Sequence, residues 1–336
     1  MSEPRALIAL SDAEIEDFFP GTLWEDVRCL LPRHRRIDPL VNGHDWPHAL
    51  EEASAEILLS CWKTPPVPQE FVVGPPNGLR YVCHLAGTVR KLVPRPLVQR
   101  GLLVTNWGSS ISANVAEATL MLTFMALRRA SYWAVAMHRE GAWKSAQTTT
   151  FSLIGRRVGI HGFGAISQAL VPMLRLFTKD IQVYSPHVPE ELFREHGVTR
   201  LHSLEKLFAT SDVVLELAAA IPENYHLVTE PLLRSIPPGG VFVNIGRGMV
   251  VDEEALVRVA RDGKLQVALD VYETEPLPAD SPLRGLPNVT LCPHLGGPTT
   301  DRRRDSGALA LRNLKAYLKG KPLEAIVNLE VYDRSS

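Results

Sequence analysis

The stretch that decides the fold is Val158-Gly159-Ile160-His161-Gly162-Phe163-Gly164-Ala165-Ile166-Ser167. Residues 158–161 form a short apolar run, which is typical of a buried parallel strand, and residues 165–177 read as a helix. Gly162 and Gly164 lie in the turn between them. Two glycines in such a turn allow the backbone to approach a pyrophosphate at the N-terminus of the helix. The stretch therefore predicts a dinucleotide-binding site.

Two positions depart from the usual dinucleotide pattern. Ser167 stands where a third glycine is expected, and Ser185 ends the next predicted strand where an acidic residue is expected to bind the adenosine ribose. The missing carboxylate removes the repulsion against a 2′-phosphate. No arginine is nearby in the sequence to attract such a phosphate, although His187 could do so. The choice between NAD and NADP therefore stays open.

Apolar runs alternate with helical stretches along the rest of the chain, as expected for parallel strands covered on both faces. The predicted strands are 6–10, 56–60, 79–83, 102–105, 158–161, 181–184, 213–217, 240–244, 267–271 and 288–291. The predicted helices are 114–139, 165–177, 203–209, 252–261 (with Asp252 as the N-cap) and 299–318. The first of these helices is apolar nearly all round, so we expect it to be buried between domains.

Composition narrows the class of protein. A chain of 336 residues predicts two domains, and a net charge of −1 argues against nucleic-acid and membrane partners. The apolar stretch 116–126 is too short to cross a bilayer. The four cysteines show no paired spacing, so we expect a reduced, cytoplasmic protein with neither a disulfide framework nor a metal site. These cysteines are Cys29, Cys61, Cys83 and Cys292.

Three polar residues each follow a predicted strand, at the edge where open α/β sheets bind their ligands. They are Arg247 in Val243-Asn244-Ile245-Gly246-Arg247-Gly248, Glu275 in the segment 269–276, and His294 in Cys292-Pro293-His294-Leu295-Gly296-Gly297. Reduction of a 2-keto acid needs a cation for the carboxylate, a histidine to move a proton and a carboxylate to orient that histidine. The three residues together therefore predict this chemistry.

With these motifs in this order, the chain resembles the D-isomer-specific 2-hydroxyacid dehydrogenases over roughly residues 81–310. Further matches are Val104-Thr105-Asn106, Ser211-Asp212-Val213-Val214 and Val251-Asp252-Glu253-Glu254-Ala255-Leu256. The resemblance implies two doubly wound parallel-sheet α/β domains. A Rossmann-type NAD(P)-binding domain (106–297) would be inserted into a flavodoxin-like substrate domain (1–105 and 298–336). It also implies hydride transfer between NAD(P)H and a 2-keto acid, and a homodimer joined through the cofactor domain.

The resemblance also implies roles for individual residues. Arg247 would bind the substrate carboxylate and polarise the carbonyl, while His294 would donate the proton. Glu275 would orient His294 and favour its protonated form. The positions that would bind the cofactor are Gly162, Gly164, Ala165 and Ile166 at the pyrophosphate, Ser185 at the ribose, and Ile245, Gly246 and Asp270 at the nicotinamide. The positions that would bind the substrate carboxylate are the backbone amides of Ala86, Gly87 and Thr88, together with Arg247.

Other functions on the same scaffold remain to be compared. Formate dehydrogenases carry a glutamine where Glu275 stands, so Glu275 counts against that activity. Phosphite dehydrogenases carry a lysine in the loop that corresponds to Leu85–Thr88, and this chain has no lysine there. A non-catalytic, dinucleotide-sensing binding protein of the corepressor kind can keep all three polar residues. The segment 214–220 also lacks the histidine and proline that the family usually has near the adenosine pocket. This departure concerns the preference and affinity for the cofactor more than the chemistry.

Overall fold

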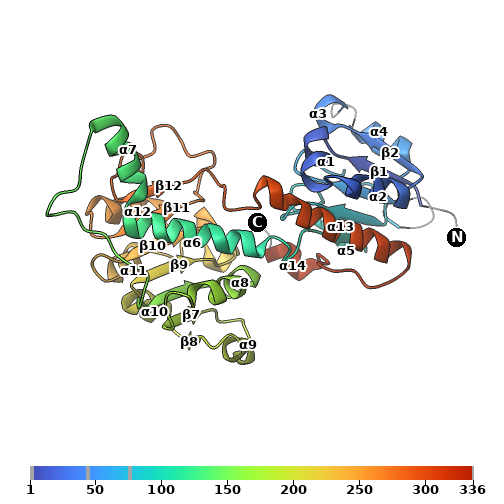
Figure 1. Cartoon of the computed structure of the whole chain (residues 1–336). Helices are drawn as coiled ribbons and strands as arrows, with labels where there is room; N and C mark the ends of the chain where they lie inside the picture. The colour runs from blue at the N-terminus through green and yellow to red at the C-terminus, as the bar shows by residue number, and fades with distance from the viewer. Residues whose placement is uncertain (1–3, 43–45, 75–77, 335–336) are drawn as a thin grey trace. The chain divides into compact units, whose positions relative to one another are not determined.

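The computed structural model describes residues 4–42, 46–74 and 78–334, and the chain divides into two compact units. Unit 1 comprises Met1–Ile111 and Pro298–Ser336, and unit 2 comprises Ser112–Gly297 (Figure 1). The first boundary lies after Ile111 rather than at residue 105. Asn106 and Trp107 belong to unit 1 because they bond to the loop that follows its fourth strand: Asn106 Nδ2 donates to Gly87 O at 2.6 Å, and Trp107 N donates to Ala86 O at 3.2 Å.

Unit 1 contains a parallel five-stranded sheet in the order β2-β1-β3-β4-β5, which is the flavodoxin-like order. Its strands are β1 (Ala6–Ala9), β2 (His34–Ile37), β3 (Ile57–Ser60), β4 (Tyr81–His84) and β5 (Leu103–Thr105). Its helices are α1 (Asp12–Phe18), α2 (Thr22–Leu30), α3 (Pro39–Asn42), α4 (Trp46–Ala53), α5 (Arg95–Gln99), α13 (Arg303–Leu318) and α14 (Leu329–Arg334).

Both faces of this sheet are buried, which explains why its central strands are mostly apolar. Along β1, Leu7 and Ala9 pack in a cluster with residues of α4, α5 and α14, while Ala6 and Ile8 pack with residues of α1, α2 and α13. Side chains of a strand alternate between faces, so each face of β1 supplies one cluster.

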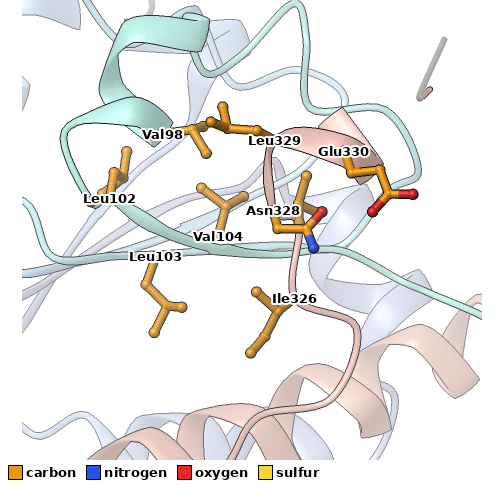
Figure 2. Close-up of a pocket in the computed structure, with 10 residues that line it drawn as sticks. Val98, Leu102, Leu103, Val104, Ile326, Asn328, Leu329 and Glu330 are labelled. Carbon is orange, nitrogen blue, oxygen red and sulfur yellow. The ribbon is translucent and has the colours of Figure 1, made fainter. Parts of the chain in front are cut away.

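The C-terminal segment covers the outer edge of β5. Val327 N donates to Val104 O at 2.8 Å, and Thr105 and Ile326 form an antiparallel bridge. Figure 2 shows a largely apolar pocket beside this edge, lined by Val98, Gly101, Leu102, Leu103, Val104, Ile326, Val327, Asn328, Leu329 and Glu330. Pairing and covering an edge strand in this way protects it from pairing with other chains.

Unit 2 contains a parallel seven-stranded sheet in the order β12-β11-β10-β9-β6-β7-β8. From β8 to β11 the order is that of the Rossmann fold, and β12 extends it at one edge. The strands are β6 (Val158–His161), β7 (Ile181–Tyr184), β8 (Thr199–Leu201), β9 (Val213–Glu216), β10 (Val241–Asn244), β11 (Gln266–Leu269) and β12 (Val289–Leu291). The helices are α6 (Ser112–Arg128), α7 (Ala130–Glu140), α8 (Ala165–Leu174), α9 (Glu190–Glu195), α10 (Leu204–Thr210), α11 (Glu230–Ser235) and α12 (Glu253–Arg261).

The predicted helix 114–139 is wrong as a single element. Arg129 adopts a left-handed conformation with φ 53°, which ends α6 and starts α7. Helix α6 packs against α8 and against β10, β11 and β12 within unit 2, which accounts for its apolar composition (Figure 1). In the part of the chain that the structure describes, none of the helices has the length and apolar character that crossing a membrane requires.

The sequence reading missed two strands, β2 and β8. Both lie at an edge of their sheet, where one side of the strand is open and polar side chains are tolerated. Strand β2 reads His34-Arg35-Arg36-Ile37 and has only Ile37 buried, so the apolar run that marks a central strand is absent.

Candidate active site

Gly162 is the first residue after β6, and its backbone needs glycine. It has φ 90°, in the left-handed region, and a Cβ there would lie 2.8 Å from Ala218 Cα and from Leu217 O. The loop after β9 therefore packs directly on the turn. This close approach explains the first glycine of the motif.

Gly164 serves the opposite purpose, because it leaves space. A Cβ at this position would meet no atom of the described chain within 4 Å, and Gly164 is the N-cap of α8 without a side-chain cap. The first backbone amides of a helix have no acceptor within the helix. In α8 these amides include those of Ala165 and Ile166. Open space at an uncapped helix N-terminus, at the centre of a Rossmann sheet, fits the pyrophosphate of NAD or NADP.

Ser167 fits its position in spite of the departure from the motif. The side chain is 1% exposed, and its Oγ donates a 2.8 Å hydrogen bond to Gly162 O. The serine therefore stays within the close contact between α8 and the end of β6, and its hydroxyl is satisfied by the turn itself.

A buried hydrogen-bonded pair, His161 and Glu216, joins the ends of β6 and β9, and the sequence analysis did not identify it. His161 Nδ1 lies 2.6 Å from Glu216 Oε2, and the two side chains are 4% and 0% exposed. Glu216 Oε1 also accepts the amide of Ala218 at 2.9 Å. The pair thus holds the loop that packs on Gly162. The signal in the sequence was Glu216, a charged residue inside the apolar run 213–217, which needs a buried partner.

The adenosine end of the nucleotide site contains an arginine that sequence proximity did not reveal. Ser185 follows β7 and is half-buried. Arg200 on β8 donates from Nη2 to Pro186 O at 3.4 Å and from Nη1 to Glu190 Oε2 at 2.8 Å, and it lies over the ring of Phe193. The expectation that no arginine is nearby is therefore wrong. Because β8 was not recognised, its position beside β7 was missed.

His294 and Glu275 are hydrogen-bonded to each other. His294 follows β12, Glu275 follows β11, and His294 Nδ1 lies 2.7 Å from Glu275 Oε2. The other carboxylate oxygen of Glu275 accepts the amide of Tyr272 at 3.0 Å, which fixes its orientation. Their side chains are 48% and 35% exposed. Since Nδ1 is used by Glu275, Nε2 is the nitrogen that can exchange a proton with a substrate.

Arg247 follows β10 in the same unit and is half-buried. Its Nη1 donates to Gly246 O at 2.7 Å. Burial lowers the pKa of Arg247, and the nearby negative charge of Glu275 opposes that effect. An arginine remains charged at neutral pH under such conditions. Arg247, Glu275 and His294 are therefore gathered at the ends of three strands that are neighbours in the sheet, β10, β11 and β12.

Asp270 holds the loop that carries His294. Its Oδ1 accepts the amide of Leu295 at 2.7 Å and its Oδ2 accepts the amide of Gly296 at 2.8 Å. Burial raises the pKa of this carboxyl, and the two amides oppose the rise. A Cβ at Gly296 would lie 2.5 Å from Ile245 Cδ1, so Ile245, Asp270 and Gly296 are tightly packed.

In unit 1, the loop after β4 leaves consecutive backbone amides without an acceptor among the described residues. The carbonyls of Ala86 and Gly87 accept from Trp107 N and Asn106 Nδ2. Within the described residues, the amides of Ala86, Gly87 and Thr88 have no acceptor. Consecutive free amides favour a carboxylate. A Cβ at Gly87 would lie 2.8 Å from the ring of Trp107, so the loop and this ring are in close contact.

Residues 120–296 match the family model described as the D-isomer specific 2-hydroxyacid dehydrogenase, NAD binding domain. The chain belongs to this family. Glyoxylate reductase of Thermofilum pendens is 32% identical over 296 residues, which are 85% of this chain and 87% of that protein. D-3-phosphoglycerate dehydrogenase of Methanocaldococcus jannaschii is 30% identical over 69% of this chain, which spans 44% of that protein. D-mandelate dehydrogenase of Rhodotorula graminis has a similar fold, with a TM-score of 0.80, 24% identity and coverage of 97% of this chain and 98% of that chain.

Family membership confirms the expected class of enzyme, a 2-hydroxyacid dehydrogenase that uses NAD or NADP. The two parallel sheets and the structural similarity confirm the expected fold class. The similar proteins are named as reductases and dehydrogenases, so they support the enzyme and not the non-catalytic binding protein. The roles of individual residues stay predictions.

Proposed function

We propose that this dehydrogenase reduces a 2-keto acid to the D-2-hydroxy acid, with Arg247, Glu275 and His294 as its catalytic residues. The observation that carries the proposal is the His294–Glu275 hydrogen bond of 2.7 Å, close to the guanidinium of Arg247. The nicotinamide cofactor supplies the hydride for the carbonyl carbon. His294 delivers a proton from Nε2 to the carbonyl oxygen, and Glu275 stabilises the imidazolium before that transfer.

In this proposal the two units divide the work. Unit 2 would be the cofactor domain (106–297 in the sequence analysis), and its residues Ile245, Gly246 and Asp270 would contact the nicotinamide. Unit 1 would be the substrate domain (1–105 and 298–336). The free amides of its loop at Gly87 suit a carboxylate. In unit 2, the charge of Arg247 can bind a carboxylate and polarise a carbonyl.

A turnover assay tests the assignment. The purified enzyme is given glyoxylate, pyruvate or phenylpyruvate with NADH or NADPH, and consumption of the reduced cofactor is followed. We expect turnover of at least one of these keto acids, with the D-hydroxy acid as the product on chiral chromatography. Binding of the cofactor without turnover of any keto acid would instead favour the dinucleotide-sensing alternative.

For the cofactor, we propose that the enzyme accepts NADPH and is relaxed or biased toward it. Ser185 offers a hydroxyl and no negative charge to a 2′-phosphate. Arg200 adds a cation on the neighbouring strand, with its Nη2 at 3.4 Å from Pro186 O. His187 is exposed and follows Pro186 directly in the chain.

We also propose a cytoplasmic homodimer joined through unit 2. Among the exposed large apolar side chains of this unit, four lie on α6, on α7 and in the segment that follows α7. They are Met121, Val135, Met137 and Trp143, with exposures of 47%, 53%, 48% and 73%. Exposed apolar groups of this size favour a protein interface. The four free cysteines suit a reducing compartment.

A further inference from the structure

Trp62 is an exposed aromatic residue at a position where ligands bind in folds of this type. It follows the end of β3 and is 47% exposed. In the order β2-β1-β3-β4-β5, the chain passes from β1 to β2 at one edge of the sheet, and from β3 to β4 in the opposite direction. The direction of the connections therefore reverses between β1 and β3, which is the topological switch point of the sheet. Open α/β sheets bind ligands beyond the carboxyl ends of the strands at such a point.

The ring of Trp62 is held in place by its neighbours. Its centroid lies 5.3 Å from that of Phe18 at 63°, and 6.2 Å from that of Trp107 at 81°, so both contacts are edge-to-face. The guanidinium of Arg303 lies over the ring at 5.1 Å and is itself paired with Asp17. A ring fixed from several sides can offer its remaining surface to a ligand without losing much conformational freedom.

Trp107 connects this ring to the loop with the free amides. A Cβ at Gly87 would lie 2.8 Å from Trp107 Cζ2, so the indole lies directly against the loop. In a 2-keto acid the side chain is attached to the carbon next to the carboxylate. If the carboxylate is bound by the amides of Gly87 and Thr88, the side chain starts only a few bonds from this aromatic wall.

We propose that Trp62 and Trp107 form the wall of the substrate side-chain pocket, and that the enzyme prefers 2-keto acids with an aromatic side chain. The proposal rests on the proposed function, because it assumes that the carboxylate binds at the loop 86–88. An aromatic side chain can pack on the exposed part of Trp62 in edge-to-face or offset geometry and remove both surfaces from water. Glyoxylate, with only a hydrogen in this position, gains none of that contact.

The experiment compares kcat/KM for phenylpyruvate, pyruvate and glyoxylate in the full-length enzyme with its preferred reduced cofactor. For the unmodified enzyme, we expect kcat/KM for phenylpyruvate to exceed that for glyoxylate by at least about tenfold, the size of effect that an apolar pocket contact provides. Trp62→Ala should lower this ratio by about tenfold or more, mainly through a higher KM for phenylpyruvate. Trp62→Phe, which keeps an aromatic ring, should retain most of the ratio.

Trp24→Ala is the matched control, because Trp24 lies in α2 of the same unit and packs on Phe19 rather than on Trp62. The ratio should stay near the unmodified value in this control. Circular dichroism establishes that each variant folds, and Trp62→Leu replaces the alanine variant if that variant does not.

The outcomes separate this proposal from the proposed function. An enzyme that reduces glyoxylate as well as or better than phenylpyruvate overturns the aromatic preference and leaves the general function intact. The aromatic preference is also overturned if Trp62→Ala and Trp24→Ala change the ratio of kcat/KM for phenylpyruvate to that for glyoxylate equally. It is overturned as well if Trp62→Ala lowers kcat for phenylpyruvate and leaves KM unchanged. Failure to reduce any keto acid with either cofactor would contradict the proposed function itself.

Discussion

At the scale of single residues, the three side chains proposed as catalytic differ in how firmly they are held. Arg247 is half-buried and close to the charge of Glu275, whereas His294 is 48% exposed and is oriented by one carboxylate oxygen. The arginine is therefore more shielded from solvent than the histidine, whose ring is accessible. The two residues should respond differently to substitution.

Arg247→Ala should lower kcat/KM for the keto acid by at least about a hundredfold, because a charge-assisted contact to the carboxylate and carbonyl is lost. The dissociation constant of the reduced cofactor, measured by fluorescence titration, should change much less. Arg194→Ala is the control, since Arg194 forms only an exposed pair with Glu191. Turnover by Arg247→Ala close to that of the control would contradict the assignment.

Glu275→Gln should lower kcat for keto-acid reduction by at least about tenfold, because it removes the carboxylate that orients His294, with Oε2 at 2.7 Å from Nδ1. An amide in this position carries no negative charge, so it supports proton transfer by the imidazole less well. Steady-state turnover of the variant and of the unmodified enzyme provides the measurement. Equal kcat values would show that Glu275 does not support the proton transfer.

Cofactor preference should depend on Ser185 and Arg200. Ser185→Asp introduces a carboxylate that can accept the 2′-hydroxyl and that repels a 2′-phosphate, so the ratio of kcat/KM for NADH to that for NADPH should rise at least about tenfold. Arg200→Ala should lower kcat/KM for NADPH more than for NADH. If the unmodified enzyme already rejects NADPH by several orders of magnitude, another group must recognise the ribose.

At the scale of elements, the central strands and the glycine turn could be predicted because burial on both faces makes a parallel strand apolar. Residues 158–161 and 181–184 were bounded correctly for that reason. The edge strands β2 and β8 carry polar residues and could not be recognised by the same pattern. The break at Arg129 was also hidden, since neither glycine nor proline marks it.

The pair formed by His161 and Glu216 links β6 to β9, so it should contribute to stability. Glu216→Ala leaves a buried imidazole without its hydrogen-bond partner and should cost about 1–3 kcal/mol in the free energy of unfolding. The double variant His161→Ile with Glu216→Leu should regain much of this loss, because an apolar pair of similar size suits two central strands. Urea unfolding followed by circular dichroism provides the measurement.

Glu191→Ala is the reference for that experiment. Its partner Arg194 and the glutamate itself are 68% and 67% exposed, so the loss should be below about 1 kcal/mol. If Glu216→Ala costs no more than Glu191→Ala, the buried pair does not hold the two strands together.

At the scale of the whole molecule, sequence motifs indicated the class of chemistry but not the environment of each residue. Arg247, Glu275 and His294 are far apart in the chain, and parallel strands bring them together at one sheet edge. The resemblance implied that Asp270 binds the nicotinamide, and the structure shows that both of its oxygens accept amides of the loop that carries His294. Such backbone contacts leave no pattern of residue types, so only the structure reveals them.

Acid should destabilise the chain through His84. This side chain is 4% exposed, its Nδ1 lies 3.0 Å from Ser60 Oγ, and burial lowers its pKa to about 4. Between that value and the ordinary value of about 6.5, the unfolded chain binds a proton that the folded chain excludes. The free energy of unfolding therefore falls as pH decreases through this range, by about 3 kcal/mol from this group.

His84→Gln should remove that part of the pH dependence, whatever its effect on stability at neutral pH. The exposed His48, replaced by glutamine, is the control. The measurement is the free energy of unfolding in urea at several pH values from about 4 to 7, a range that includes the ordinary pKa of histidine. Equal slopes for the two variants would show that His84 is not the group responsible.

The position of α13 has a consequence for the order in which a growing chain can fold. This helix supplies Ala310, Leu311 and Leu314 to the cluster on one face of the unit 1 sheet, and a Cβ at Gly307 would lie 1.7 Å from Phe18 O. During synthesis, β1 to β5 leave the ribosome before all of unit 2, and α13 leaves after it. Part of one apolar face of the first sheet, next to α1 and α2, therefore stays uncovered while unit 2 can already fold. In this enzyme the domain that begins first is the one that must finish last.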